Sequence, residues 1–207
     1  MSSNDPSTNP QSDEPSATDP QDVVAAFMHA ANDHDLPRAL GMLHPQFRYR
    51  EEGSDGFLGR AEMKDLLGWD RVVESEVHCE SMDAKGDVVT GIFWETNGLY
   101  HRLGIETTRC RLAFHVEDGL VREQTIEQRD EGAFLAALEP FLEWAEEAAP
   151  DEIEAIQPAG EFVFSAEMGR RWLQLLDRWR SETGGPDFDD PADPGDETAE
   201  HDAEDGD

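Results

Sequence analysis

The sequence is poor in lysine and in long apolar segments, and these two absences exclude several classes of protein. Only two of the 16 basic residues are lysines, against 48 acidic residues, and the formal net charge is −32. Binding to nucleic acid through counterion release and docking on anionic membranes both need basic surfaces, so the charge excludes both. No apolar run approaches the roughly 20 residues that a membrane-spanning helix requires.

Cysteine is equally scarce. Cys79 and Cys110 form no CxxC pair, so two small buried side chains in a reducing compartment are expected rather than a disulfide. The first 20 residues show neither the basic start nor the apolar segment of a secretory signal, which predicts a cytoplasmic protein. Histidines at metal-ligand spacing and phosphate-binding glycine loops are also lacking, so no metal and no cofactor are expected.

The acidic residues are spread unevenly along the chain. Residues 1–20 carry a net charge of −4, and residues 184–207 carry −11 without one basic residue. These tails contain too few apolar residues to offset the entropy of ordering, so we expect both to be disordered. Between them we expect a folded domain over 21–130 and a helical extension over 131–183. The acid excess without lysine favours adaptation to molar salt, as in a halophile, over an acidic partner-mimicking surface.

Hydrophobic periodicity predicts three helices around one strand in the first part of the domain. Apolar residues recur at helical spacing in 22–33, 36–43 and 60–69, and they alternate with polar residues in 46–52. The period then changes to two.

Four strands of about ten residues are predicted next, joined by short turns. They span 73–82, 87–97, 104–116 and 120–129. Helical spacing returns after Asp130. The pattern predicts an α+β fold in which the N-terminal helices pack on the concave face of a curved antiparallel sheet, with a C-terminal helical extension.

Three stretches carry a resemblance to a known family: NDHDL (32–36), ALGMLHPQFRY (39–49) and FHVEDGLVREQTIEQRD (114–130). They resemble the nuclear-transport-factor-2-like superfamily, which includes ketosteroid isomerases, limonene-epoxide hydrolases and SnoaL-type polyketide cyclases. The resemblance implies a conical fold with a pocket between sheet and helices for a small apolar ligand. It also implies a homodimer, because the outer face of the sheet commonly pairs in this fold.

Glu51 is the sharpest catalytic candidate. The resemblance places it about where ketosteroid isomerases keep their carboxylate base. Among Phe47 and Tyr49, burial would destabilise the ionised form, and such a group can move a proton between carbon atoms of a ketone or lactone. The alternative is that the strand ends here and Glu51 is solvated like Glu52.

A second acid–base candidate is His101, on the loop predicted at the pocket mouth. The residues expected to line the pocket are Phe27, Tyr49, Trp69, Trp94, Leu112 and Phe114. The tyrosine and the tryptophans suit a core position equally well, with their polar atoms satisfied.

Two departures from the family pattern argue against the family's known activities in this chain. Phe27 stands where ketosteroid isomerases carry a hydrogen-bonding tyrosine, and Cys110 or Arg111 stands near their buried acid, so the enolate would lack two donors. The epoxide hydrolases carry an Arg-x-Asp pair, which here reads Arg109-Cys110-Arg111.

Two readings of the function therefore stay open. One is a SnoaL-like pocket protein that transfers a proton or closes a ring on a small apolar carbonyl compound, without a cofactor. The other is a non-catalytic ligand-binding or dimerisation module whose pocket is filled by its own side chains. Whether residues 131–183 cap the pocket, cover the sheet or mediate assembly also stays open.

Overall fold

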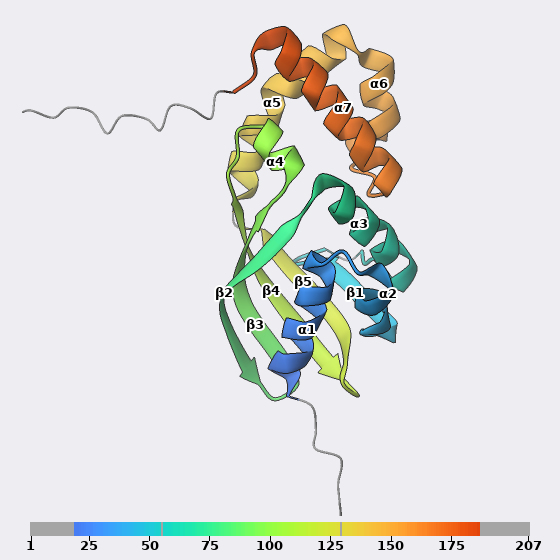
Figure 1. The fold of residues 1–207 in the computed structure, drawn as a ribbon, viewed down its shortest axis with the longest axis vertical. Coiled ribbons are helices and arrows are strands. Elements are labelled where there is room, and N and C mark those ends of the chain that lie inside the picture. The colour runs from blue at the N-terminus through green and yellow to red at the C-terminus, as the bar shows by residue number, and fades with distance from the viewer. Residues whose placement is uncertain (1–18, 55, 129, 187–207) are drawn as a thin grey trace, which may run out of the picture.

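The computed structural model describes residues 19–186 except Asp55 and Arg129, and of Glu131 it describes the backbone alone. The predicted disordered tails therefore lie outside the described residues, apart from 19–20 and 184–186. Along the chain the elements are α1 (Pro20–Asn32), α2 (Leu36–Gly41), β1 (Leu43–Glu51), α3 (Arg60–Val73), β2 (Glu76–Lys85), β3 (Val88–Thr96), α4 (Gly98–Arg102), β4 (Thr108–Glu117), β5 (Leu120–Gln128), α5 (Glu131–Ala148), α6 (Pro150–Ile156), η1 (Pro158–Gly160) and α7 (Ala166–Thr183) (Figure 1).

The first helix begins and packs for simple reasons. The Asp19 side chain accepts a hydrogen bond from the Gln21 backbone, and Pro20 occupies the first turn, where its missing N–H costs nothing. The spacing of Val23 and Phe27 places both on one buried face. This face lies on the concave side of the sheet, over β2 to β5.

One five-stranded sheet of order β1-β5-β4-β3-β2 forms the scaffold. The four consecutive strands predicted from the alternation are confirmed, and they pair antiparallel. The predicted α+β fold with a curved antiparallel sheet is confirmed for β2 to β5, with one correction: β1 pairs with β5 in parallel and makes the sheet mixed. α3 and the three following strands intervene between these two partners, and sequence periodicity says nothing about such distant pairing.

The segment expected to be a loop between β3 and β4 contains the short helix α4. Asn97 caps it, because its side chain accepts hydrogen bonds from the backbone N–H groups of Leu99 and Tyr100. These bonds satisfy two of the free N–H groups of the first turn.

Strand β4 shows how the sheet separates its two faces. Its residues alternate between buried and exposed, with Cys110, Leu112 and Phe114 inside and Arg109 and Arg111 outside, as the sequence predicts. Cys110 is buried as expected, whereas the expectation is wrong for Cys79, which is exposed on β2 beside a register shift.

The C-terminal helices extend the sheet domain at one end (Figure 1). α7 packs along α3 and α4, and α5 and α6 pack against α7. A second core forms there around Trp69, Leu99, Phe141, Trp172 and Leu176. Among the described residues, the extension therefore packs on α3 and α4 at this end of the domain and makes no extensive contact with the strands of the sheet.

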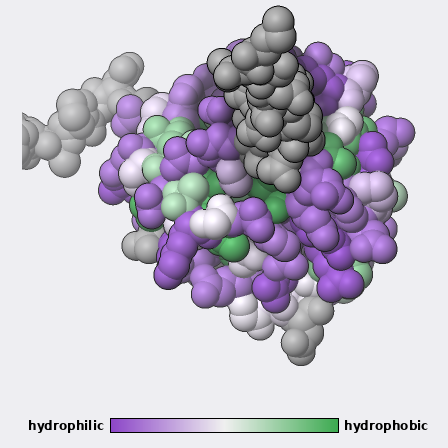
Figure 2. All heavy atoms as spheres, turned by 90° about the horizontal axis from the view of Figure 1, so that it is seen from below, coloured by the Kyte–Doolittle hydropathy of each residue, from purple (hydrophilic) through white to green (hydrophobic). Residues whose placement is uncertain are grey.

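The opposite end of the molecule, where α1 begins, is largely hydrophilic, with small hydrophobic areas between charged residues (Figure 2). No described helix is long and apolar enough to cross a membrane.

Candidate functional site

A cavity of about 400 Å³ lies between the inner face of the sheet, α3 and the C-terminal extension. Its walls are mainly apolar, and Leu66, Trp69, Leu112, Phe134 and Phe162 are among the residues that line it. Phe162 stacks on Trp172 of the second core at a centroid distance of 4.8 Å. The extension thus contributes part of the cavity wall as well as covering the end of the domain.

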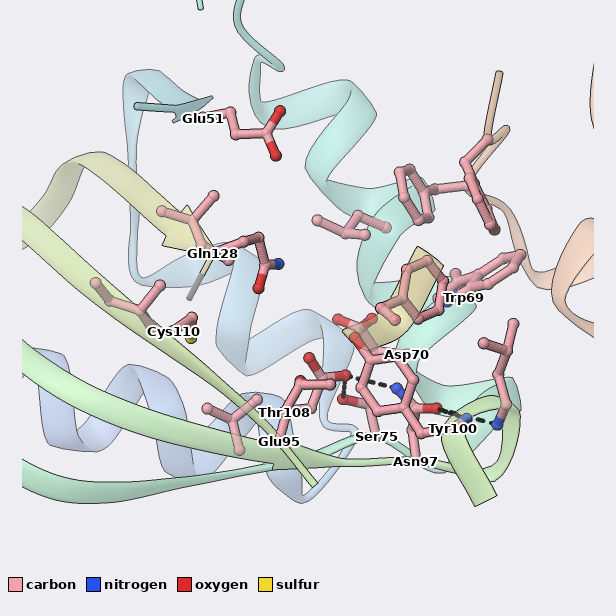
Figure 3. A pocket seen from close by; sticks show the side chains of 18 of the residues that line it. Glu51, Trp69, Asp70, Ser75, Glu95, Asn97, Tyr100, Thr108, Cys110 and Gln128 are labelled. Atoms are coloured by element: carbon pink, nitrogen blue, oxygen red, sulfur yellow. Dashed lines mark hydrogen bonds between the residues drawn. The ribbon is translucent and has the colours of Figure 1, made fainter. Parts of the chain in front are cut away.

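Two carboxyl groups, those of Asp70 and Glu95, lie at one end of this cavity (Figure 3). Asp70 follows Met63 by seven residues on α3 and so lies on the helix face that packs inward. Glu95 is in phase with Val89 and Phe93 on β3, which point to the inner face of the sheet. Both acids are partly exposed, and both line the cavity.

Neutral donors hold the Glu95 carboxylate. The Ser75 hydroxyl donates to Glu95 Oε1 at 2.7 Å, and the Asn97 amide donates to the same oxygen at 2.9 Å. Ser75 and Asn97 are each only 5% exposed. Asn97 also caps α4, so its amide is fixed in position before any ligand binds. Among the described residues, no hydrogen bond to the Asp70 carboxyl is formed.

These different surroundings separate the two acids electrostatically. Burial raises the pKa of Asp70 well above its ordinary value, and the charge of nearby Glu95 raises it further. Burial also raises the pKa of Glu95, but the hydrogen bonds from Ser75 and Asn97 act in the opposite direction. The pair therefore holds its last proton preferentially on Asp70, while Glu95 ionises first.

Two tyrosines complete this end of the cavity. Burial raises the pKa of Tyr49 and Tyr100 far above the ordinary value, and the nearby charges of Asp70 and Glu95 add to the effect on both. Both phenols consequently stay protonated at neutral pH and can donate hydrogen bonds. None of the lining residues that the structure describes carries a positive charge, and Glu51 and Asp130 add two further acids.

Four residues expected from the sequence line the cavity: Tyr49, Glu51, Trp69 and Leu112. Glu51 lies at the end of the cavity away from Asp70, near Gln128 (Figure 3). Its side chain is exposed, so it lacks the burial on which its predicted role as a base rested. The catalytic role of Glu51 stays a prediction.

Three of the predicted lining residues lie elsewhere. Phe27 and Phe114 pack edge to face in the core under α1, with centroids 6.4 Å apart. Trp94 points to the opposite side of the sheet from Glu95 and stacks on His78 of β2 at 4.0 Å. The alternation of β3 places the odd-numbered residues Val89 and Phe93 inside, so Trp94 faces outward.

His101 is not among the residues that line the cavity. It sits on α4, and its Nε2 lies 2.7 Å from the Thr96 hydroxyl. The predicted position at the mouth assumed a loop, and the helix that forms there turns the ring toward Thr96 instead.

Asp70, Glu95 and Gln124 are cavity residues that the sequence reasoning missed. A signal for the two acids exists, because each is a charged residue in phase with a buried stripe. Val121 and Gln124 are both buried although they lie three residues apart on β5, because the strand register shifts between them. Simple alternation along the sequence therefore does not predict the inward position of Gln124. In the described part of the chain, no group of three or more His, Cys, Asp or Glu residues could hold a metal ion.

Comparison with known proteins finds similar solved structures but no matching sequence family. No protein-family model matches the chain, and no curated protein matches it. The chain is similar to an NTF2-like protein of unknown function from Cytophaga hutchinsonii, with 18% identity over 58% of this chain and 98% of that chain, at a TM-score of 0.47.

Two further solved structures show the same degree of likeness. One is an LEH-like epoxide hydrolase of M. tuberculosis, with 18% identity over 57% of this chain and 84% of that chain, at a TM-score of 0.48. The other is IdmH from Streptomyces antibioticus, with 16% identity over 58% of this chain and 99% of that chain, also at 0.48. NTF2-like abbreviates nuclear-transport-factor-2-like, the name of the superfamily that the sequence resembles.

Proposed function

We propose that the protein binds a small, largely apolar carbonyl compound in the cavity and transfers a proton at the carbon next to the carbonyl. Glu95 serves as the base and Asp70 as the acid. The observation that carries the proposal is the placement of two carboxyl groups, one held by neutral donors and one without any described donor, at the same end of an apolar cavity.

The proposed step conserves protons within the site. The Glu95 carboxylate takes a proton from the α-carbon, the C–H electron pair forms the C=C bond of the enol, and the carbonyl oxygen takes the Asp70 proton. In the reverse direction the enol oxygen returns its proton to Asp70, and Glu95 returns a proton to carbon. In D2O the carboxyl proton on Glu95 exchanges with solvent deuterium while the enol is bound, so the net result is exchange of an α-hydrogen for deuterium.

The surroundings favour this chemistry for a neutral substrate. Acid–base groups act best when one is ionised and its partner protonated, and the two environments supply that difference. The protonated phenols of Tyr49 and Tyr100 offer hydrogen bonds toward the developing enolate. The negative charges in the cavity oppose carboxylate and phosphate ligands.

Glu51 is the alternative base, because the sequence favours it and it lines the same cavity. We assign the base to Glu95 because solvent surrounds Glu51, and an exposed carboxylate is a weak base at carbon. The assignment predicts that Glu51→Gln lowers the exchange rate much less than Glu95→Gln does.

The experiment that tests the proposal follows α-hydrogen exchange of bicyclic ketones and lactones in D2O by proton NMR. We expect exchange by the native protein, and a 10²- to 10⁴-fold slower rate in Glu95→Gln. Glu80→Gln is the matched control, because Glu80 pairs with Arg109 outside the cavity. We expect its rate to stay within about twofold of native, as for a surface ion pair.

The same experiment decides between catalysis and the non-catalytic binding module. Probes that bind without any exchange would overturn the proposed activity and leave a binding function. Equal loss of exchange in Glu80→Gln and Glu95→Gln would overturn the assignment of the base. Binding is measured separately, by isothermal titration calorimetry in molar KCl.

We further propose that the protein acts in the cytoplasm as a homodimer adapted to molar salt. The outer face of the sheet supports a dimer, because among the described residues the extension makes no extensive contact with the strands of the sheet. Light scattering in molar KCl tests the assembly, with a mass of about twice 23.1 kDa expected for the dimer. A mass of one chain would overturn it.

A further inference from the structure

Gln124 carries polar atoms that the described part of the protein does not satisfy. It lies on β5, faces the cavity and is only 7% exposed. Its Oε1 is fully buried and has no hydrogen-bond partner among the described residues, and no hydrogen bond from its amide nitrogen to them is formed either. Buried side-chain amides nearly always have partners, because an unpaired one loses its bonds to water without replacement.

The walls beside Gln124 explain why no side chain reaches it. In the sheet it lies between Tyr49 on β1 and Phe114 on β4. Phe114 is part of the aromatic core under α1, and no hydrogen bond joins Gln124 to Tyr49. A polar group brought in by a ligand is therefore the available partner.

This position is separate from the acid pair. Glu95 lies opposite Thr108 at the start of β4, whereas Gln124 lies opposite Phe114, six residues further along the strand. Six residues of extended strand span roughly 20 Å along the backbone. The polar ends of the two side chains lie closer together, because Tyr49 pairs with Gln124 in the sheet and its phenol is near enough to Glu95 for that charge to raise its pKa. One functional group of a ligand cannot serve both places, so a ligand that satisfies both carries two polar groups on an apolar skeleton.

The hydrogen-bonding atoms of the Gln124 amide determine which second polar group the ligand carries. A hydroxyl can donate to Oε1 and accept from the amide nitrogen, so it satisfies either orientation of the Gln124 side chain. A methyl ether offers no donor. A carboxylate has no donor at neutral pH, and it would enter a cavity whose described charged residues are all acidic.

We propose that Gln124 determines specificity for a ligand hydroxyl at the end remote from the carbonyl. The ligand class is thus an elongated, apolar hydroxyketone, and this inference rests on the proposed function for its carbonyl end only. Gln124 acts by binding and takes no part in the proton transfer.

The test uses one linear tricyclic ketone skeleton, perhydroanthracen-2-one, with a hydroxyl, a methoxy group, an ammonium group or hydrogen at the ring position farthest from the carbonyl. Dissociation constants are measured by calorimetry and α-hydrogen exchange by NMR. We expect the native protein to bind the hydroxyl compound about tenfold more tightly than the methoxy or unsubstituted compounds, as for one hydrogen bond to a buried acceptor. A preference for the ammonium compound would overturn the hydroxyl assignment.

Gln124→Met removes the amide at nearly constant shape. We expect it to bind all neutral probes alike, with the unsubstituted ketone bound as tightly as by the native protein. Gln128→Met is the matched control, because Gln128 lines the same cavity from the same strand and is exposed. It should keep the tenfold preference.

The outcomes separate the two proposals. A hydroxyl preference without α-hydrogen exchange overturns the proposed catalysis and supports the role of Gln124. Exchange without a hydroxyl preference in the native protein overturns the role of Gln124 alone, and this result does not depend on whether a variant folds. Retention of the preference in Gln124→Met also overturns it, and failure of every probe to bind overturns both proposals.

Discussion

The two faces of the sheet surround their carboxylates with different partners. On the outer face, Arg109 of β4 pairs with Glu80 of β2, and Arg111 lies 3.8 Å from Glu127. On the inner face, Glu95 receives hydrogen bonds from uncharged donors only, and no positive charge is present among the described residues that line the cavity. Glutamates on neighbouring strands thus lie beside arginine on the outer face and beside apolar walls on the inner face.

The difference separates charge on the exposed surface from charge that can serve chemistry. An exposed carboxylate that pairs with arginine is hydrated in both the folded and the unfolded chain, so such pairs contribute little to stability. An acid in an apolar cavity loses hydration that neutral donors replace only in part, so its proton affinity rises. Most of the described acids therefore belong to the exposed surface, whereas Asp70 and Glu95 owe their properties to the few residues around them.

The largest effect is expected from removing the charge of Asp70, in the variant Asp70→Asn. The folded-state pKa of Asp70 lies above its unfolded value, so the native protein binds the proton more tightly than the unfolded chain. Stability of the native protein then falls as pH rises from about 4 toward the folded-state pKa, by about 1.4 kcal/mol for each pH unit. Asp70→Asn should be more stable than the native protein at pH 8 and equal to it near pH 4.

Urea unfolding at a series of pH values checks this prediction. The isosteric change keeps the volume of the side chain, so packing cannot produce a pH-dependent difference. A constant difference between the two proteins from pH 4 to pH 8 would contradict the buried-acid interpretation.

The next effect concerns the donors that hold Glu95. Ser75→Ala removes a hydrogen bond to a charged group inside the protein, which costs about 2 kcal/mol of unfolding free energy. Loss of the donor also raises the pKa of Glu95, so the acidic limb of the exchange-rate profile should move to higher pH. Ser81→Ala is the control on the same sheet, and a profile that moves equally in both variants would contradict the role of Ser75.

A smaller effect is expected from opening the cavity wall. Phe162→Ala removes the ring that stacks on Trp172 and contacts Trp69, with an expected loss of about 1.5 kcal/mol. Water would then reach the acid pair, and the pKa of Asp70 should fall toward its ordinary value. NMR titration of the Asp70 carboxyl carbon measures this, and an unchanged titration would show that the extension does not control the site.

The smallest effect belongs to the outer face. Glu80→Gln breaks the pair with Arg109, and the free energy of unfolding should change by less than about 1 kcal/mol. Any change should disappear in 1 M salt, which screens exposed charges. A loss that persists in high salt would show that the two faces differ less than their surroundings suggest.

Much of the fold can be predicted from the sequence because its signals are local. The alternation of Cys110, Leu112 and Phe114 identifies the inner face of β4, and the structure agrees. The parallel pairing of β1 with β5 and the position of the extension depend on contacts between distant segments, which periodicity does not contain. The helix after Asn97 depends on one capping side chain within a short loop.

The site is harder to predict for a related reason. Asp70 and Glu95 come from different elements, and each resembles an ordinary surface acid until the walls around it are known. The family resemblance favours Glu51, yet a matching strand sequence does not tell whether solvent reaches the end of that strand. Local phase could have identified Glu95, since it continues the inward set of Val89 and Phe93.

The protonation state of the acid pair is measured most directly by infrared spectroscopy of carboxyl groups at pH 7. A protonated carboxyl absorbs at a frequency apart from that of carboxylates. We predict the band of one protonated carboxyl, lost in Asp70→Asn and retained in Glu80→Gln. Absence of such a band in the native protein, or its persistence in Asp70→Asn, would contradict the buried acid pair.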